Sequence, residues 1–266
     1  SANLKNYIKQ EKGRKGYSMI IDTHTHLGYD YVYEEDFNLK DLLDNMERNK
    51  VDISIVQPGT VLDLDTAIAQ HNAIAALSED MPGRIFGMAN PNPHMPKDTY
   101  RKELERCIND LGFVGVKLNP PAHAVNPSQS VGRKVFEAAL DLAVPIMVHT
   151  GSGIPWSLPS VLIPIARDFP DLSIILAHSG GSMFASEAAL AAQLSPNIHL
   201  EASWLPGFTV RRLCRTLGAD RIMFGSDHGD NVATELTKFR SIGLTDEELE
   251  LCLGKTAAKV FKISIR

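Results

Sequence analysis

The chain has 266 residues, of which 27 are lysine or arginine and 32 are aspartate or glutamate, giving a formal net charge of −5. Hydrophobic residues make up 44% and charged residues 22%, which excludes the composition of a disordered chain and the basic excess usual in nucleic-acid binders. Its three cysteines are far apart and form no CxxC pair, so we expect neither a disulfide framework nor a thiolate metal site, and we predict a cytoplasmic protein.

The N-terminal segment 1–18 carries five basic side chains and no apolar run after them, unlike a secretory signal. We expect it to be a flexible extension, with the folded domain spanning residues 19–266. The stretch 142–166 has no acidic, lysine or arginine side chain and is long enough to span a bilayer. Four prolines and two glycines interrupt it, so we predict a buried strand and a loop there instead of a membrane helix.

From residue 19 the chain alternates short β-branched apolar runs with amphipathic stretches of helical period, such as 39–50 and 64–79. Runs of nearly continuous apolar character predict strands buried on both faces. The eight runs are 19–24, 52–57, 84–90, 113–118, 145–150, 173–178, 197–203 and 221–227. Their ends are 24 to 33 residues apart, which suits one βα unit each. We predict an α/β fold, a single (β/α)8 TIM barrel with extra C-terminal helices after Thr245; an open doubly wound sheet is the alternative.

Polar residues close several of these runs, at the end of the barrel where functional side chains gather. His24 and His26 are two residues apart, so on an extended chain they point to the same face, about 7 Å apart. His149, His178 and Asp227 close the fifth, sixth and eighth runs. Nitrogen and oxygen donors that meet at one end of a barrel predict a catalytic metal site. His71, which lies in a helical stretch, is expected to be structural.

Five motifs in chain order resemble the amidohydrolase superfamily, and within it the branch of aminocarboxymuconate-semialdehyde decarboxylase and related metal-dependent hydrolases. They are DTHTH at 22–26, GVKL at 115–118, VHTG at 148–151, LAHSGG at 176–181 and FGSD at 224–227. The resemblance implies that His24, His26, His149 and Asp227 bind one divalent ion, with His178 and Asp227 as catalytic residues. Zinc is the ion expected for such imidazole-rich ligation, with Mn²⁺ or Fe²⁺ as alternatives.

Further residues are candidates for contact with the substrate or with the ligands. Lys117 is predicted to bind a substrate carboxylate or carbonyl as a free ammonium; a carboxylated lysine bridging two metals and a structural salt bridge are the alternatives. Trp156 and His123, in the loops after the fifth and fourth strands, are predicted to contact substrate. Asp22 is predicted to accept a hydrogen bond from a ligand histidine or a neighbouring polar group.

Two reactions use the same residues. The first prediction is a hydrolase in which a metal-activated water cleaves an amide, ester or lactone of a small carboxylated substrate, with Asp227 as the base. The alternative is a non-oxidative decarboxylase of a small aromatic or unsaturated acid. The compact chain, without an arginine cluster on its loops, favours hydrolysis; a metal-free binding protein is the least favoured interpretation. A small molecule is the expected partner, with no nucleic acid or membrane, and the apolar segment 183–194 fits either a homodimer contact or packing on the barrel.

Overall fold

The computed structural model describes residues 19–153 and 155–264 of the chain; the extension expected at 1–18 lies outside the described residues. The described strands form one sheet in the order β2-β1-β3-β4-β5-β6-β7-β8-β9. The strands are β1 (Ile21–Asp30), β2 (Glu35–Phe37), β3 (Ile53–Pro58), β4 (Ile85–Ala89), β5 (Gly115–Leu118), β6 (Ile146–His149), β7 (Ile174–Ala177), β8 (Ile198–Glu201) and β9 (Ile222–Met223). β1 and β2 are antiparallel, and every other pair is parallel.

Each of the eight predicted runs contains a strand, and the predicted α/β class with a parallel sheet is confirmed. The sequence did not predict β2, because its three residues include two acidic ones and form no apolar run. β2 pairs with the extended end of β1 as a hairpin. Two backbone hydrogen bonds join β1 to the chain that follows β9: Thr23 N donates to Phe224 O (3.2 Å) and Asp227 N donates to His24 O (2.6 Å).

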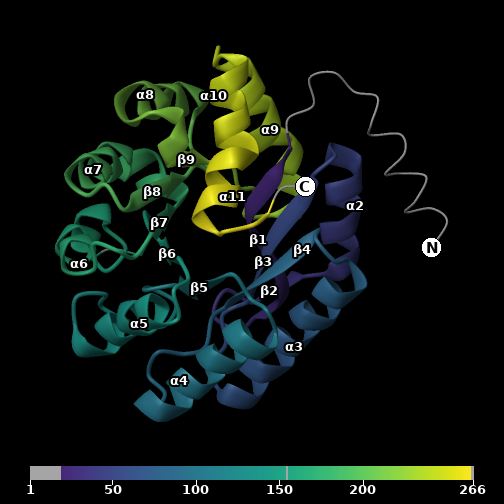
Figure 1. Ribbon diagram of the computed structural model, residues 1–266, viewed down its shortest axis with the longest axis vertical. Helices are drawn as coiled ribbons and strands as arrows, with labels where there is room; N and C mark the ends of the chain where they lie inside the picture. The colour runs from purple at the N-terminus through teal and green to yellow at the C-terminus, as the bar shows by residue number, and fades with distance from the viewer. Residues whose placement is uncertain (1–18, 154, 265–266) are drawn as a thin grey trace.

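Helices surround the strands and cover their outer side (Figure 1). The longer ones are α2 (Leu39–Asn49), α3 (Leu64–Asp80), α4 (Lys97–Glu105), α5 (Ser130–Asp141), α6 (Leu162–Asp168), α7 (Gly181–Leu194), α8 (Gly207–Leu217) and α9 (Val232–Ser241), followed by α10 (Asp246–Glu250) and α11 (Thr256–Val260). Side-chain caps begin several of them: Asn38 accepts from Asp41 N, and Thr245 forms a capping box with Glu248, which satisfies amide groups that a helix start leaves unpaired. Within the described part of the chain, no helix combines the length and apolarity needed to cross a bilayer.

Alternating strand residues build two cores. Side chains such as Val56, Val116 and Leu176 pack outward against the helices. Their neighbours in sequence, such as Ile55 and Ile175, join an inner core that the C-terminal segment after α11 also enters. Apolar side chains therefore fill the interior of the curled sheet, and the polar residues lie beyond them at the carboxyl ends of the strands.

Candidate metal centre

Three donor atoms converge at the carboxyl ends of β1 and β9. His24 Nε2 lies 3.1 Å from Asp227 Oδ1, His26 Nε2 lies 3.3 Å from the same oxygen, and the two Nε2 atoms are 3.2 Å apart. Ligands held about 2.0–2.2 Å from a tetrahedral ion are themselves about 3.3–3.6 Å apart. The spacing and the imidazole–carboxylate chemistry of this set fit a single divalent ion, as the sequence predicts for these three residues.

Glu201, at the end of β8, orients His24. Its Oε2 accepts a hydrogen bond from His24 Nδ1 at 2.9 Å, so the proton is on Nδ1 and the Nε2 lone pair faces the other donors, an arrangement typical of metal-ligating histidine. Burial raises the pKa of Glu201, but its hydrogen bond and attraction to His24 lower it further, to about 2. Glu201 is therefore a permanent anion beneath the site. The role of Glu201 could not be assigned from the sequence, because its contact with His24 spans 177 positions.

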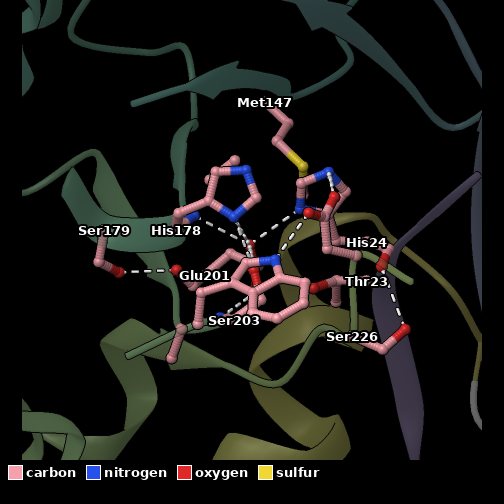
Figure 2. Close-up of polar contacts among 12 residues, drawn as sticks. Thr23, His24, Met147, His178, Ser179, Glu201, Ser203 and Ser226 are labelled. Atoms are coloured by element: carbon pink, nitrogen blue, oxygen red, sulfur yellow. Dashed lines mark hydrogen bonds and ion pairs between the residues drawn. The ribbon is translucent and has the colours of Figure 1, made fainter. Parts of the chain in front are cut away.

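His178, just after β7, is held by the same carboxylate through Ser203 (Figure 2). His178 Nδ1 lies 2.7 Å from Ser203 Oγ, and Ser203 Oγ donates to Glu201 Oε2 at 2.9 Å. Because the hydroxyl proton goes to Glu201, His178 Nδ1 donates to Ser203 and its Nε2 carries a free lone pair. Burial lowers the pKa of His178, which keeps the ring neutral. Its ring centroid lies 4.9 Å from that of His24.

His149, at the end of β6, lies beside these residues without joining them. Its ring centroid is 4.9 Å from that of His178, but its Nε2 is 3.2 Å from the carbonyl oxygen of Ser152. Among the described residues it belongs to no group of converging donors. Its assignment as a metal ligand therefore stays a prediction.

Asp227 occupies a constrained position after β9. Its backbone φ is +65°, a region that non-glycine residues seldom adopt, and the turn aims its carboxylate at the two imidazoles. Burial raises its pKa, but His24 and His178 lower it more strongly, so it stays well below the usual range. The indole Nε1 of Trp204 donates to Asp227 Oδ2 at 2.7 Å. This contact could not be predicted from the sequence, because the two residues are 23 positions apart and share no motif.

Lys117 reaches the same group from β5. Its Nζ lies 2.9 Å from His24 Nε2, and the residue is 3% exposed. Burial lowers the pKa of the ammonium to about 8, against the opposing attraction of Asp227 and Glu201. The group therefore carries a positive charge for most of the time at neutral pH.

Asp22 ties the first strand to the last one. Its Oδ1 accepts from Ser226 N (2.9 Å) and from His24 N (3.2 Å), and its Oδ2 accepts from Ser226 Oγ (2.6 Å). Burial raises its pKa to about 7. Asp22 thus holds the backbone beside both His24 and Asp227, where the sequence predicted a hydrogen bond to a ligand or a polar neighbour.

The two other predicted substrate contacts lie on loops. His123 is buried, with its Nε2 3.3 Å from the carbonyl oxygen of Val61, and burial lowers its pKa to about 4. Trp156 is half-buried in the loop after β6. Neither residue joins the donor groups among the described residues, so their contact with substrate stays a prediction.

Comparison with known proteins identifies relatives of two reaction classes. A 2-keto-4-carboxy-3-hexenedioate hydratase from a Sphingobium species is 31% identical over 140 residues, which are 44% of this chain and 41% of the relative. A 2-amino-3-carboxymuconate-6-semialdehyde decarboxylase from Dictyostelium discoideum is 22% identical over 177 residues, 53% of this chain and 47% of the relative. The aligned segment is thus less than half the length of each relative.

Solved structures share the fold. A 5-carboxyvanillate decarboxylase from Novosphingobium aromaticivorans, in complex with manganese and 4-hydroxy-3-methoxy-5-nitrobenzoic acid, superposes with a TM-score of 0.75 at 16% identity, covering 94% of this chain and 97% of that one. The sequence also matches the profile of the family described as Amidohydrolase over residues 21–263. This match spans all nine strands and the candidate ligands, and the chain therefore belongs to the amidohydrolase family.

Proposed function

We propose that this chain is a metal-dependent carboxy-lyase that removes CO2 from a small carboxylic acid. The observation that carries the proposal is the buried ammonium of Lys117, 2.9 Å from His24 Nε2. Among the described residues, no carboxylate forms an ion pair with it. Its hydrogen-bond partner is the neutral imidazole of His24. A buried ammonium is stabilised more by a paired anion, so the free enzyme favours an anionic substrate group beside the candidate ligands. The decarboxylases among the relatives favour this reaction over hydrolysis.

The residues divide the chemistry between them. His24, His26 and Asp227 would hold a divalent ion, which would supply Lewis-acid stabilisation of negative charge on a substrate oxygen. Lys117 binds and orients the substrate next to the ligands. The bond between the carboxylate carbon and its neighbour breaks, CO2 leaves, and the electron pair stays on the remaining carbon. His178, whose Nε2 lone pair is free, takes a proton from a substrate hydroxyl or water and returns it to that carbon.

We also propose the identity of the ion, a fourth ligand and the closure of the sheet. Zinc is the ion expected at His24, His26 and Asp227, one per chain, with His149 as the further ligand once its ring turns away from Ser152. We also interpret the two backbone hydrogen bonds between β1 and the chain after β9 as the closure of an eight-stranded barrel.

Hydrolysis is the second candidate, and the environment of Asp227 favours it. Its Oδ1 lies within 3.3 Å of both imidazoles, while the Trp204 indole holds Oδ2. A carboxylate fixed in this way is placed to accept the proton of a water that attacks an ester, lactone or amide.

Elemental analysis and a CO2-release assay test the proposal together. We expect about one Zn²⁺ or Mn²⁺ per chain and release of CO2 from members of a panel of carboxylated phenols. Lys117→Met should raise KM roughly 10- to 150-fold, the loss expected for a hydrogen bond to a charged group, with unchanged metal content. Hydrolysis of lactones or esters without CO2 release would contradict the carboxy-lyase and support the second candidate. A chain that takes up no metal would contradict both.

A further inference from the structure

Three carboxamide side chains stand at the carboxyl ends of β3, β4 and β5. These residues, Gln57, Asn90 and Asn119, form what we name the amide row, and they are 0%, 2% and 9% exposed. The side-chain oxygen of each has no hydrogen-bond donor among the described residues. Buried polar atoms nearly always have a partner in folded proteins, and an unpaired one destabilises the native state. Three such oxygens in one region indicate that a ligand supplies the donors.

The amide row faces the interior of the curled sheet. Ile55 and Met88, two residues before the first two members, belong to the inner core. Lys117, two residues before the third member, extends its ammonium to His24. Side chains alternate between the two faces of a strand, so all three amides continue positions that point inward. They lie one layer nearer the open end than the apolar side chains.

The sheet register places the amide row next to the candidate ligands and the ammonium. Gln57 is the direct ladder partner of His26 across β1 and β3. The register of β4 and β5 brings Asn90 beside Lys117. A small molecule whose carboxylate reaches Lys117 therefore extends its remaining atoms over these amides.

Local contacts decide which half of each amide a ligand meets. The Gln57 nitrogen lies 3.1 Å from the sulfur of Met147. In Asn119, as in Gln57, the side-chain oxygen has no hydrogen-bond donor among the described residues. These oxygens only accept hydrogen bonds, so they favour hydroxyl or amino groups and disfavour a second carboxylate.

We propose that the amide row is a substrate subsite that recognises hydroxyl or amino hydrogens, and that the substrate is a small carboxylic acid carrying at least one such group. The inference rests on the proposed function, because Lys117 and the metal centre fix the other end of the substrate. A site whose buried acceptors depend on ligand donors rejects the analogue that lacks them, since its own polar groups are then left unpaired.

Matched ligand pairs test the subsite on the metal-loaded protein. Calorimetry compares 3-hydroxybutyrate with butyrate, and 3,4-dihydroxybenzoate with benzoate. We expect the hydroxylated member of a pair to bind at least about tenfold more tightly, the effect of one well-made hydrogen bond to a buried acceptor. In Gln57→Met, Asn90→Leu and Asn119→Leu, this preference should fall to less than about threefold while the affinity for the unhydroxylated member is retained. Equal affinities within both pairs for the wild type would overturn the proposal.

Thermal melting of the chelated protein gives an independent readout that needs neither metal nor turnover. Gln57→Met and Asn90→Leu remove an unpaired acceptor and should raise the melting temperature, by roughly 2–4 °C. Asn197→Leu is the matched control, because its amide nitrogen already donates to the carbonyl oxygens of Ala166, Phe169 and Leu172; it should lower the melting temperature. A fall in both row variants would show that these amides serve the fold, and would overturn the subsite. Metal content measured in parallel decides the proposed function separately.

Discussion

Two buried clusters of histidine and carboxylate occur in this molecule, and they differ in how their lone pairs are used. In the candidate metal cluster (His24, His26, Asp227 and Glu201), three donor atoms face one another within 3.3 Å. In the helical cluster (His71, Glu103, Arg106 and Cys107), each acceptor already has a donor. The residue types are nearly the same, so composition does not separate a reactive site from a structural one.

The hydrogen bonds made by each cluster distinguish the two. His71 Nδ1 lies 2.6 Å from Glu103 Oε1, and its Nε2 accepts from the backbone of Asn90 at 3.1 Å. Arg106 donates to both oxygens of Glu103, at 2.8 Å each. Both nitrogens of His71 and both oxygens of Glu103 are therefore already hydrogen-bonded within the protein, although the geometry brings three potential ligands together. We infer that the helical cluster holds α3 and α4 against the end of β4, through the hydrogen bond from the backbone of Asn90 to His71.

Removing the histidine should therefore reduce metal binding in one cluster and stability in the other. This is the largest effect that we expect. His24→Ala deletes a ligand, so metal content and turnover should fall by more than the 10- to 100-fold typical of altering a ligand's hydrogen-bond partner. His71→Ala removes a buried hydrogen bond to the Glu103 carboxylate, which keeps Arg106 as its partner. It should cost about 1.5–3 kcal/mol of unfolding free energy, with metal content per folded chain unchanged. Elemental analysis and urea unfolding of both variants provide the check. Loss of metal in His71→Ala would contradict the structural role assigned to the helical cluster.

Acid should weaken the helical cluster in a defined window. Burial raises the pKa of Glu103, but the hydrogen bonds and charges of His71 and Arg106 lower it further, from 4.5 to about 2. A carboxyl whose folded pKa is depressed stabilises the protein above its unfolded pKa and loses that contribution as the pH falls toward the folded value. At about 1.4 kcal/mol for each pH unit, the loss between pH 4.5 and 2 is roughly 3 kcal/mol.

The variant Glu103→Gln isolates this contribution. Its unfolding free energy should be lower than that of the wild type at pH 6, and the gap should close by roughly 3 kcal/mol as the pH approaches 2. Other acidic groups, including Glu201, titrate in both proteins and cancel in the difference. A gap that stays constant across this range would mean that the Glu103 charge does not stabilise the helical cluster.

The α/β class and the strand positions could be predicted from the sequence for a physical reason. Continuous apolar runs mark strands buried on both faces, and polar residues that close these runs, such as His24 and Asp227, are expected at one end of the sheet, where they stay candidate ligands. Contacts between residues far apart in the sequence leave no such pattern. Glu201 contacts His24 across 177 positions, and Trp204 contacts Asp227 across 23. The amide row was also missed, because an unpaired oxygen is visible only after every neighbouring donor has been placed.

The smallest expected effect comes from replacing one carboxylate by an amide of the same shape in each cluster. In Glu201→Gln the side chain keeps its shape, but its amide nitrogen can donate to His24 Nδ1 and move the imidazole proton to Nε2, where it blocks metal binding. We expect metal affinity to fall by about 10- to 100-fold, measured by competition with a chelator of known affinity. Glu103→Gln, the matched change in the helical cluster, should leave metal affinity unaltered. If Glu201→Gln binds metal as tightly as the wild type, Glu201 does not set the tautomer of His24, and its carboxylate supports the fold in the same way as that of Glu103.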